Sequence, residues 1–282
     1  MTEFQVHPLG QAETILLATD GSAYCEGAVQ EAIFFGQACN ARIVALYVVS
    51  VSSETATAVR AASVEKMKEI RPFFESFKKM AADSGIECET IVKESYQPEK
   101  TIVEEARRQK ADIIIMGRHG KRGLLQLLVG SMTAKVIGQR FPKVLVVPRN
   151  VIISGETVLL ATDGSEFSRL VTEETISLAK NCSTLKNIVV ISVVKRDSDL
   201  ENARKIVRDV RKIMEANKID VNCEYLAEIG SPAELIVERA KERSADMILM
   251  GGYGKGLSKL LMGHVTERVI GKAECAVLVL EK

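Results

Sequence analysis

The chain has 282 residues, which exceeds the usual size of one domain, so we expect two domains of about 140 residues each. Hydrophobic residues make up 46% of the chain and charged residues 27%, proportions that exclude wholesale disorder. The formal net charge of +1 provides no basic excess for a nucleic-acid-binding groove, so we expect no nucleic-acid partner.

The cysteines and the apolar runs bear on the compartment. Six cysteines occur without a Cys-x-x-Cys pair, namely Cys25, Cys39, Cys88, Cys182, Cys223 and Cys275. This spacing argues against a structural zinc site and a thioredoxin-like motif, so we interpret them as buried, reduced thiols. The N-terminal segment has no signal-peptide layout, and no apolar run approaches the roughly 20 residues that a membrane span requires. We therefore predict a cytoplasmic protein without a membrane span.

Short apolar segments alternate with longer amphipathic ones in the first half, as in a parallel sheet with crossover helices. We predict strands near residues 14–19, 42–50, 87–93, 112–116 and 143–148. Helices are predicted near residues 23–39, 58–84, 98–109 and 131–140, with Gly85 as a C-terminal stop and Pro98 in a first turn. The strands are almost continuously apolar, which indicates burial on both faces of the sheet.

The second half repeats this order of elements. We predict strands near residues 157–162, 187–194, 220–227, 246–250 and 275–280. Ser231-Pro232-Ala233-Glu234 combines capping-box spacing with a first-turn proline, which predicts the start of a helix. The first half carries extra length in residues 51–85. We interpret that stretch, including residues 52–57, as a surface connection, with a flexible loop over the site as the alternative.

An internal repeat sets the domain organisation. Residues 14–22, TILLATDGS, return as TVLLATDGS at residues 157–165, and residues 111–117 return in similar form at 245–251. A period of this length indicates duplication of a whole domain. We therefore predict tandem domains at residues 1–150 and 151–282, joined by a short linker at residues 149–156.

Two loops of the first half should meet at the carboxyl edge of the sheet, where open parallel sheets bind ligands. One loop is Ala18-Thr19-Asp20-Gly21-Ser22, and the other runs from Gly117 to Ser131. Glycines let the backbone approach a ligand closely, and a helix start offers free N–H groups to an anion, which suits phosphate. Asp20 is a candidate to bind a ribose hydroxyl or a metal, with capping of the following helix as the alternative.

The glycine stretch differs from two common phosphate-binding motifs. It lacks the Gly-Lys-Ser/Thr ending of a Walker loop, and it follows the wrong strand for the dinucleotide fingerprint. Its spacing, Gly117-x-x-Gly120, nine residues and then Gly130-Ser131, resembles the nucleotide-binding motif of the universal stress protein family. The Ala-Thr-Asp-Gly-Ser segment resembles the opening segment of that family, and the similarity covers essentially the whole chain as two tandem domains.

The resemblance implies an α/β fold with two flavodoxin-like, Rossmann-like domains, each a five-stranded parallel sheet with helices on both faces. It implies ATP or another adenine nucleotide as ligand, with or without Mg²⁺. By family position, Val48 lies at the adenine, and Thr19 and Asp20 lie near adenine and ribose. The other candidates follow the two loops, with the phosphates on the second: Ala18, Gly117, Arg118, His119, Gly120, Gly130, Ser131 and Met132.

The second copy departs from the family pattern. Only eight residues separate Gly254 from Gly263, and His264 stands where serine or threonine is expected. The histidine either attracts phosphate as a cation or fills the pocket with its ring. If this second site binds nucleotide, its candidate residues are Asp163, Val193, Gly251, Gly254, Gly263 and His264.

No catalytic residue and no metal ligand set are predicted. His119 lies between two glycines, but its counterpart is Tyr253 and no acid or nucleophile stands beside it, so we interpret it as flanking the ligand or the surface. The sequence has no recognisable base, arginine finger or paired-carboxylate site, so any hydrolysis should be slow.

Three functions remain open. The first is a stress-response regulatory protein that binds an adenine nucleotide and acts on an unknown protein partner. The second is an interaction module of the same fold with vestigial loops; the resemblance implies that the last strands, residues 144–147 and 277–280, form an intramolecular pseudo-dimer that can dimerise again. The third is an adenylyl-transferring or ATP-pyrophosphate-cleaving enzyme, which is disfavoured because residues 18–22 carry no His-x-Gly-His or Ser-Gly-Gly-x-Asp signature.

Overall fold

The computed structural model describes residues 12–51, 56–118, 130–253 and 262–281. In the first half the strands are β1 (Thr14–Ala18), β2 (Arg42–Ser50), β3 (Cys88–Ser95), β4 (Ile113–Gly117) and β5 (Lys143–Val147). The helices are α1 (Glu26–Cys39), α2 (Ala56–Asp83), α3 (Pro98–Arg108) and α4 (Ser131–Gly138), with a short 3₁₀ turn, η1 (Ala23–Cys25), before α1.

The second half follows the same order. Its strands are β6 (Thr157–Ala161), β7 (Asn187–Val194), β8 (Asn222–Ile229), β9 (Met247–Gly251) and β10 (Ala276–Leu280). Its helices are α5 (Glu166–Asn181), α6 (Leu200–Ala216), α7 (Pro232–Glu242) and α8 (His264–Lys272), and η2 (Asp197–Asp199) precedes α6.

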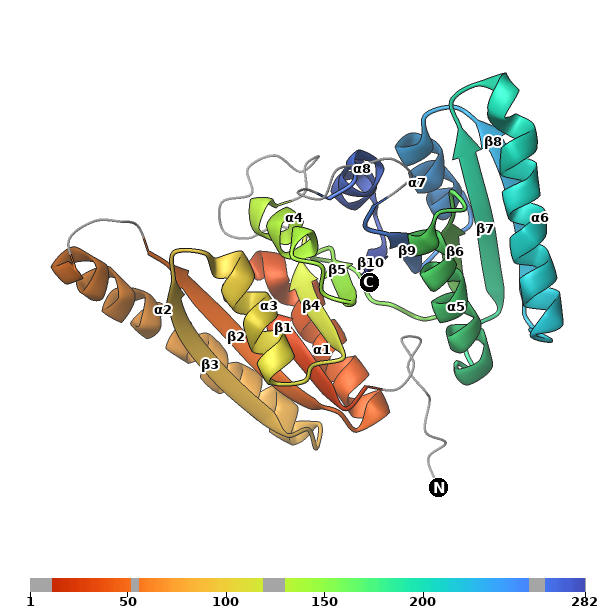
Figure 1. Cartoon of the computed structure of the whole chain (residues 1–282). Coiled ribbons are helices and arrows are strands. Elements are labelled where there is room, and N and C mark those ends of the chain that lie inside the picture. Colours follow the sequence, from red (N-terminus) through yellow and green to blue (C-terminus); the bar gives the residue numbers. More distant parts are fainter. Residues whose placement is uncertain (1–11, 52–55, 119–129, 254–261, 282) are drawn as a thin grey trace.

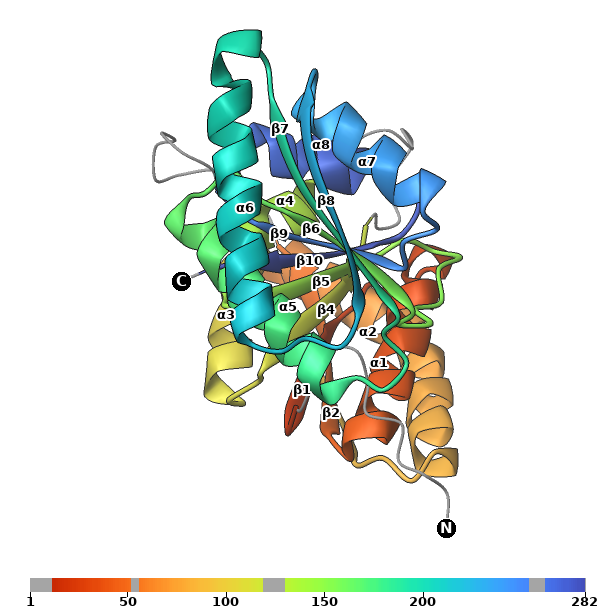
Figure 2. The same ribbon diagram turned by 90° about the vertical axis from the view of Figure 1, so that its right-hand side faces the viewer.

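The strands form one continuous sheet in the order β3-β2-β1-β4-β5-β10-β9-β6-β7-β8 (Figure 1). All pairs within each half are parallel. The halves join through β5 and β10, which pair antiparallel, with Val146 opposite Val277 and Val144 opposite Val279. The α/β fold class is confirmed, and the expected pairing of the last strands merges the two five-stranded sheets into one. Figure 2 shows the twist that this long sheet accumulates between β2 and β8.

Helices cover both faces of the sheet, so the strands are buried on both sides. One core holds Ile15 and Leu17 of β1 together with residues of α1, α2, α5 and α6. The other core holds Leu16 and Ala18 with residues of α3, α4, α7 and α8. Neighbouring residues of a strand point to opposite faces, which explains why the continuous apolar runs of the sequence are all buried.

The boundaries of several elements differ slightly from expectation. Strands β3 and β8 run about two residues beyond the predicted ends, because their ladders with β2 and β7 continue to Ser95 and Ile229. Gly85 ends α2 in the left-handed region, with φ of 71°, and Pro98 opens α3, as predicted. Ser231 precedes α7 as its N-cap residue, but its side chain makes no capping hydrogen bond, so the predicted capping box is only partly formed.

Candidate functional site

The turn after β1 is held by its own side chains at the carboxyl edge of the sheet. The N–H of Thr19 donates to the carbonyl of Leu46 on β2 at 3.0 Å. The N–H of Gly21 donates to Thr19 Oγ1 at 3.1 Å, and the N–H of Ser22 donates to Asp20 Oδ1 at 3.0 Å. Asp20 therefore stabilises the Gly-Ser turn itself, whereas the alternative role predicted for it was a cap of the following helix.

The second half repeats this turn. The N–H of Thr162 donates to the carbonyl of Ile191 at 2.9 Å. Gly164 and Ser165 donate to Thr162 Oγ1 and Asp163 Oδ1 at 3.3 and 2.9 Å. The near-identical sequences therefore fold into the same polar turn, which directs an aspartate to the same position in each half.

The second loop of the first half is closed at its base by main-chain contacts. The N–H of Arg118 donates to the carbonyl of Val147 at 3.3 Å, and the N–H of Gly130 donates to the carbonyl of Arg118 at 2.9 Å. Thr133 Oγ1 donates to the carbonyl of Gly117 at 3.0 Å. The last contact ties the first turn of α4 to the end of β4, and Thr133 was not among the predicted site residues.

The corresponding base in the second half uses equivalent residues. Gly252 donates its N–H to the carbonyl of Leu280 at 3.1 Å, and Gly263 donates to the carbonyl of Gly252 at 2.8 Å. Thr266 Oγ1 donates to the carbonyl of Gly251 at 2.9 Å, as Thr133 does in the first half. A threonine stands three residues after the N-cap glycine in both copies, so the repeat alone could have predicted this contact.

The start of each helix lies beside its loop. Helix α4 begins at Ser131 with Gly130 as its N-cap residue, and α8 begins at His264 with Gly263 in that position. Neither glycine has a capping side chain, so first-turn N–H groups remain available to an anion. His264 is exposed at the start of α8, and both alternatives for its side chain, attraction of phosphate and filling of the pocket, stay predictions.

A pocket of about 150 Å³ opens between these elements in the second half. Asp163, Val193 and Gly251 line it among the predicted residues, whereas Gly263 and His264 do not. Its other lining residues include Tyr253, which was not among the predicted site residues and is the counterpart of His119 in the repeat. The complete lining consists of Ala161, Thr162, Asp163, Ser165, Ser168, Ile191, Val193, Pro232, Ile236, Met250, Gly251, Tyr253, Val265 and Thr266.

The candidates of the first half lie on the elements that correspond to those around the second-half pocket, namely β1, β2, β4 and α4. Val48 on β2 and Met132 on α4 pack against the same hydrophobic cluster as Ala18. The turn with Thr19 and Asp20 continues from Ala18 at the edge of the sheet. Three predicted residues, His119, Gly120 and Gly254, lie outside the described residues.

Helix α2 lies on the face of the sheet opposite to α4 and packs against the turn after β1. Gly21 has φ of +68°, and a Cβ atom there would lie 2.5 Å from Ile70 Cδ1. Burial, followed by the charges of Asp20 and Glu69, raises the pKa of Tyr47 on the same face. Most of the extra length of the first half is therefore a supporting helix, and residues 52–55 of the loop considered as an alternative lie outside the described residues.

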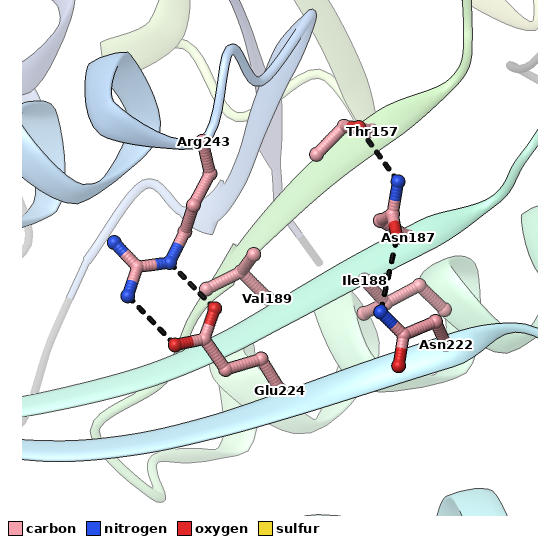
Figure 3. A pocket seen from close by; sticks show the side chains of 7 residues that line it. All are labelled: Thr157, Asn187, Ile188, Val189, Asn222, Glu224 and Arg243. Carbon is pink, nitrogen blue, oxygen red and sulfur yellow. Dashed lines mark hydrogen bonds and ion pairs between the residues drawn. The ribbon is translucent and has the colours of Figure 1, made fainter.

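Another pocket, of about 240 Å³, lies at the amino-terminal edge of the second half (Figure 3). Asn187 donates to Thr157 and accepts from Asn222, and Arg243 donates to both carboxylate oxygens of Glu224. The polar side chains of this pocket therefore use hydrogen bonds to one another. Ligands of parallel α/β sheets bind at the carboxyl edge, which is opposite to this pocket. We therefore interpret this pocket as a structural feature and not as the functional site.

In each half an ion pair joins the third strand to the following helix, and the acidic and basic partners exchange places between the halves. In the first half Lys93 on β3 pairs with Glu105 on α3 at 2.5 Å, and in the second half Glu228 on β8 pairs with Arg239 on α7 at 2.8 Å. Burial raises the pKa of Glu105, but hydrogen bonds from Arg108, Lys93 and Gln109 outweigh this effect and lower it to about 2. The carboxyl group is therefore ionised at neutral pH and holds α3 against the sheet.

Neither a cluster of metal-ligating side chains nor a membrane-spanning helix occurs in residues 12–51, 56–118, 130–253 and 262–281. Within these ranges no group of three or more His, Cys, Asp or Glu side chains is arranged to hold a metal ion. No helix in the same part of the chain is long and apolar enough to cross a bilayer.

Comparison with known proteins gives consistent matches to one family. The model of the universal stress protein family matches residues 12–148 and again residues 155–281. A universal stress protein of Methanocaldococcus jannaschii is 35% identical over 152 residues, which cover 47% of this chain and 88% of that protein. A universal stress protein of Mycolicibacterium smegmatis is 25% identical over 289 residues, which cover 94% of this chain and 96% of that protein.

A solved structure shares the fold of the whole chain. The crystal structure of a universal stress protein from Archaeoglobus fulgidus has a TM-score of 0.74 with 21% sequence identity. The match covers 96% of this chain and 99% of that one. The tandem arrangement of the two halves is therefore present in a solved structure of comparable length.

Proposed function

The chain belongs to the universal stress protein family, and we propose that it is a stress-response regulatory protein that binds ATP or another adenine nucleotide in each half. One observation carries the proposal. In both halves an aspartate-held turn lies at the same sheet edge as a helix start whose N-cap residue is glycine, and a threonine hydroxyl ties that helix to the adjacent strand.

The chemistry of this arrangement suits a nucleotide. Val48 and Val193 offer apolar surface to an adenine ring, and the carboxylates of Asp20 and Asp163 accept hydrogen bonds from ribose hydroxyls. The helix start at Ser131 adds a hydroxyl to its backbone N–H groups, and the positive end of the α4 dipole favours phosphate. His264 supplies its backbone N–H at the equivalent place, so we extend the proposal to the second half.

We propose binding with little or no turnover. Asp20 and Asp163 already accept hydrogen bonds from the N–H groups of Ser22 and Ser165, which orients them as fixed acceptors. A general base must instead reach the proton that it removes. Regulation would then proceed through the nucleotide-bound state and a protein partner, in the cytoplasm.

Equilibrium dialysis with labelled ATP tests the placement of the first site. We expect about two nucleotides per wild-type chain and about one for the double variant Gly130→Val with Ser131→Ala, because the added side chain crowds the helix start and one phosphate donor is lost. Val193→Trp should remove the other nucleotide by filling the second pocket. Unchanged stoichiometry and affinity in the double variant would refute the site.

A second candidate is an interaction module without nucleotide. The antiparallel pairing of β5 and β10 favours it, because these two strands join the halves through backbone hydrogen bonds that need no bound nucleotide. A homodimer of whole chains would then need another surface, since these two strands already pair with each other. Mass spectrometry of the denatured protein that releases no nucleotide, together with no binding on titration, would support this reading, and ultracentrifugation would give the oligomeric state.

A further inference from the structure

Helices α4 and α8 cover the same face of the sheet on either side of the β5–β10 pair (Figure 1). Each helix starts at one proposed phosphate site, at Ser131 or His264. Helix α8 has nine residues, so it spans about 13 Å from its start to its end. The far end of each helix therefore lies well away from its own site, and what it contacts there decides whether the sites are connected.

The end of α8 contacts the loop of the first half. The guanidinium of Arg118 donates through Nη1 to the carbonyl of Ala273 at 2.7 Å and to that of Gly271 at 3.4 Å. These are carbonyl groups that the helix itself leaves unsatisfied, at the negative end of its dipole. Arg118 also closes the base of the first loop through its own carbonyl, so one residue joins the first site to the helix that starts at the second.

The end of α4 contacts the pocket of the second half. Arg140 follows α4 in the left-handed region, with φ of 57°, and its guanidinium carbon lies 5.0 Å from the centre of the Tyr253 ring. The ring of Tyr253 is 4% exposed, lines the pocket and packs against Phe167 at 5.8 Å between centroids. A side chain of the first half thus helps to hold one wall of the second pocket.

Both arginines belong to the first half, and the repeat does not duplicate them. Their counterparts are Gly252 and Ala273, which have no long side chain. Each arginine nevertheless contacts the second half near the counterpart of the other arginine. Arg118 donates to the carbonyl of Ala273, and Arg140 lies over Tyr253, the residue after Gly252. Substitution of either arginine therefore removes one contact between the halves, and no equivalent arginine in the second half can replace it.

We propose that the two nucleotide sites are coupled, with occupancy of one raising the affinity of the other through the Arg118 and Arg140 contacts. This inference rests on the proposed function. A phosphate at the start of α4 restricts that helix and therefore Arg140, which restricts Tyr253 in the second pocket. The loss of conformational freedom in the shared junction then occurs mainly with the first nucleotide, so the second binds more tightly.

Two-site titration of the full chain with a fluorescent ATP analogue tests the coupling. We expect the second half of the wild-type protein, with the first half occupied, to bind nucleotide about fivefold more tightly than the second half of the Gly130→Val, Ser131→Ala variant, whose first site is blocked. This ratio is at the low end of common allosteric effects. Arg140→Met should keep two sites but reduce the difference to less than about twofold, since a cation over an aromatic ring is lost. Arg140→Lys should restore part of it, and Arg208→Met, on the distant helix α6, serves as the matched control.

Each other outcome has a definite meaning. Two independent sites in the wild type would overturn the coupling, and unchanged cooperativity in Arg140→Met would overturn its transmission through Arg140. Both results leave the proposed function intact. One nucleotide per chain would overturn the coupling and the extension of the proposed function to both halves, whereas no binding at all would overturn the coupling and the whole proposed function. Hydrogen exchange without nucleotide gives a separate readout: Arg140→Met should speed exchange in residues 247–253, and an unchanged rate would remove the proposed route.

Discussion

Glu281 carries a carboxyl group that is buried at the junction of the halves, and its replacement by glutamine isolates the effect of that charge on stability. The residue is 4% exposed, and neither carboxylate oxygen has a hydrogen-bond partner among the described residues. Its N–H donates to the carbonyl of Pro142 at 2.9 Å, which fixes it against the first half. The carboxylate lies on the backbone of Gly252, where an added Cβ would be 1.5 Å from Oε1.

The pKa of Glu281 gives the expected magnitude. Burial raises the pKa from 4.5 to about 8, and the charge of Arg140 opposes this only in part. The folded state therefore retains a proton that the unfolded chain releases, so stability is full below pH 4.5 and falls as the pH rises toward 8. A shift of this size corresponds to at most about 5 kcal/mol. Because local rearrangement relieves part of it, we expect Glu281→Gln to stabilise the protein by about 2–4 kcal/mol at pH 8.

Urea denaturation followed by circular dichroism at pH values from 5 to 9 measures this effect. Glu281→Gln should match the wild type near pH 5, where the wild-type carboxyl is protonated, and should become increasingly more stable above it. Glu75→Gln, at an exposed position on α2, is the matched control and should run parallel to the wild type. If the Glu281→Gln and wild-type curves were also parallel, the carboxyl would not be buried as argued.

Three further changes test other parts of the structure. Glu105→Gln should destabilise the protein by about 2–3 kcal/mol at pH 7, and the difference should shrink as the pH falls toward 2, because the lowered pKa of Glu105 stabilises the fold only while it is ionised; urea curves at pH 7 and 3 measure it. Gly21→Ala should cost more stability than Gly85→Ala, since both glycines have positive φ but a Cβ at Gly21 would contact Ile70, whereas a Cβ at Gly85 would have no neighbouring atom within 4 Å; equal thermal shifts would contradict this packing. Val193→Trp should abolish ATP binding in the second half and leave the melting temperature within a few degrees, and unchanged stoichiometry would show that the pocket is not the site.

Much of the fold was predictable because its signals are local. The alternation of apolar runs, the glycine at position 85 and the proline at position 98 act within a few residues, and the corresponding strands and helix ends are observed. The candidate site was partly predictable for the same reason. The Asp-Gly-Ser turns depend on hydrogen bonds two residues apart, and the helix starts at Ser131 and His264 follow directly from the glycines before them.

Other features of the site depend on residues that are distant in sequence. The support of Gly21 by α2, the exposure of His264 and the position of Tyr253 in the pocket wall have no signature in a single sequence. Lys93 and Glu105 exchange charge signs with Glu228 and Arg239 across the repeat, which hides the shared ion pair from a search for identical residues. Geometry reveals it because both pairs join the same strand and helix.

The sequence by itself determined that a domain had been duplicated, which elements each copy contains and where a polar turn faces a glycine loop. These properties follow from side-chain periodicity and from the conformational preferences of glycine and proline, which act along the chain. Only the tertiary structure decided that β5 and β10 form one sheet from two, that Arg118 and Arg140 reach across the junction and that Glu281 is buried there. Such contacts depend on how the completed halves pack, because their partners are brought together by the fold and not by their spacing in the chain.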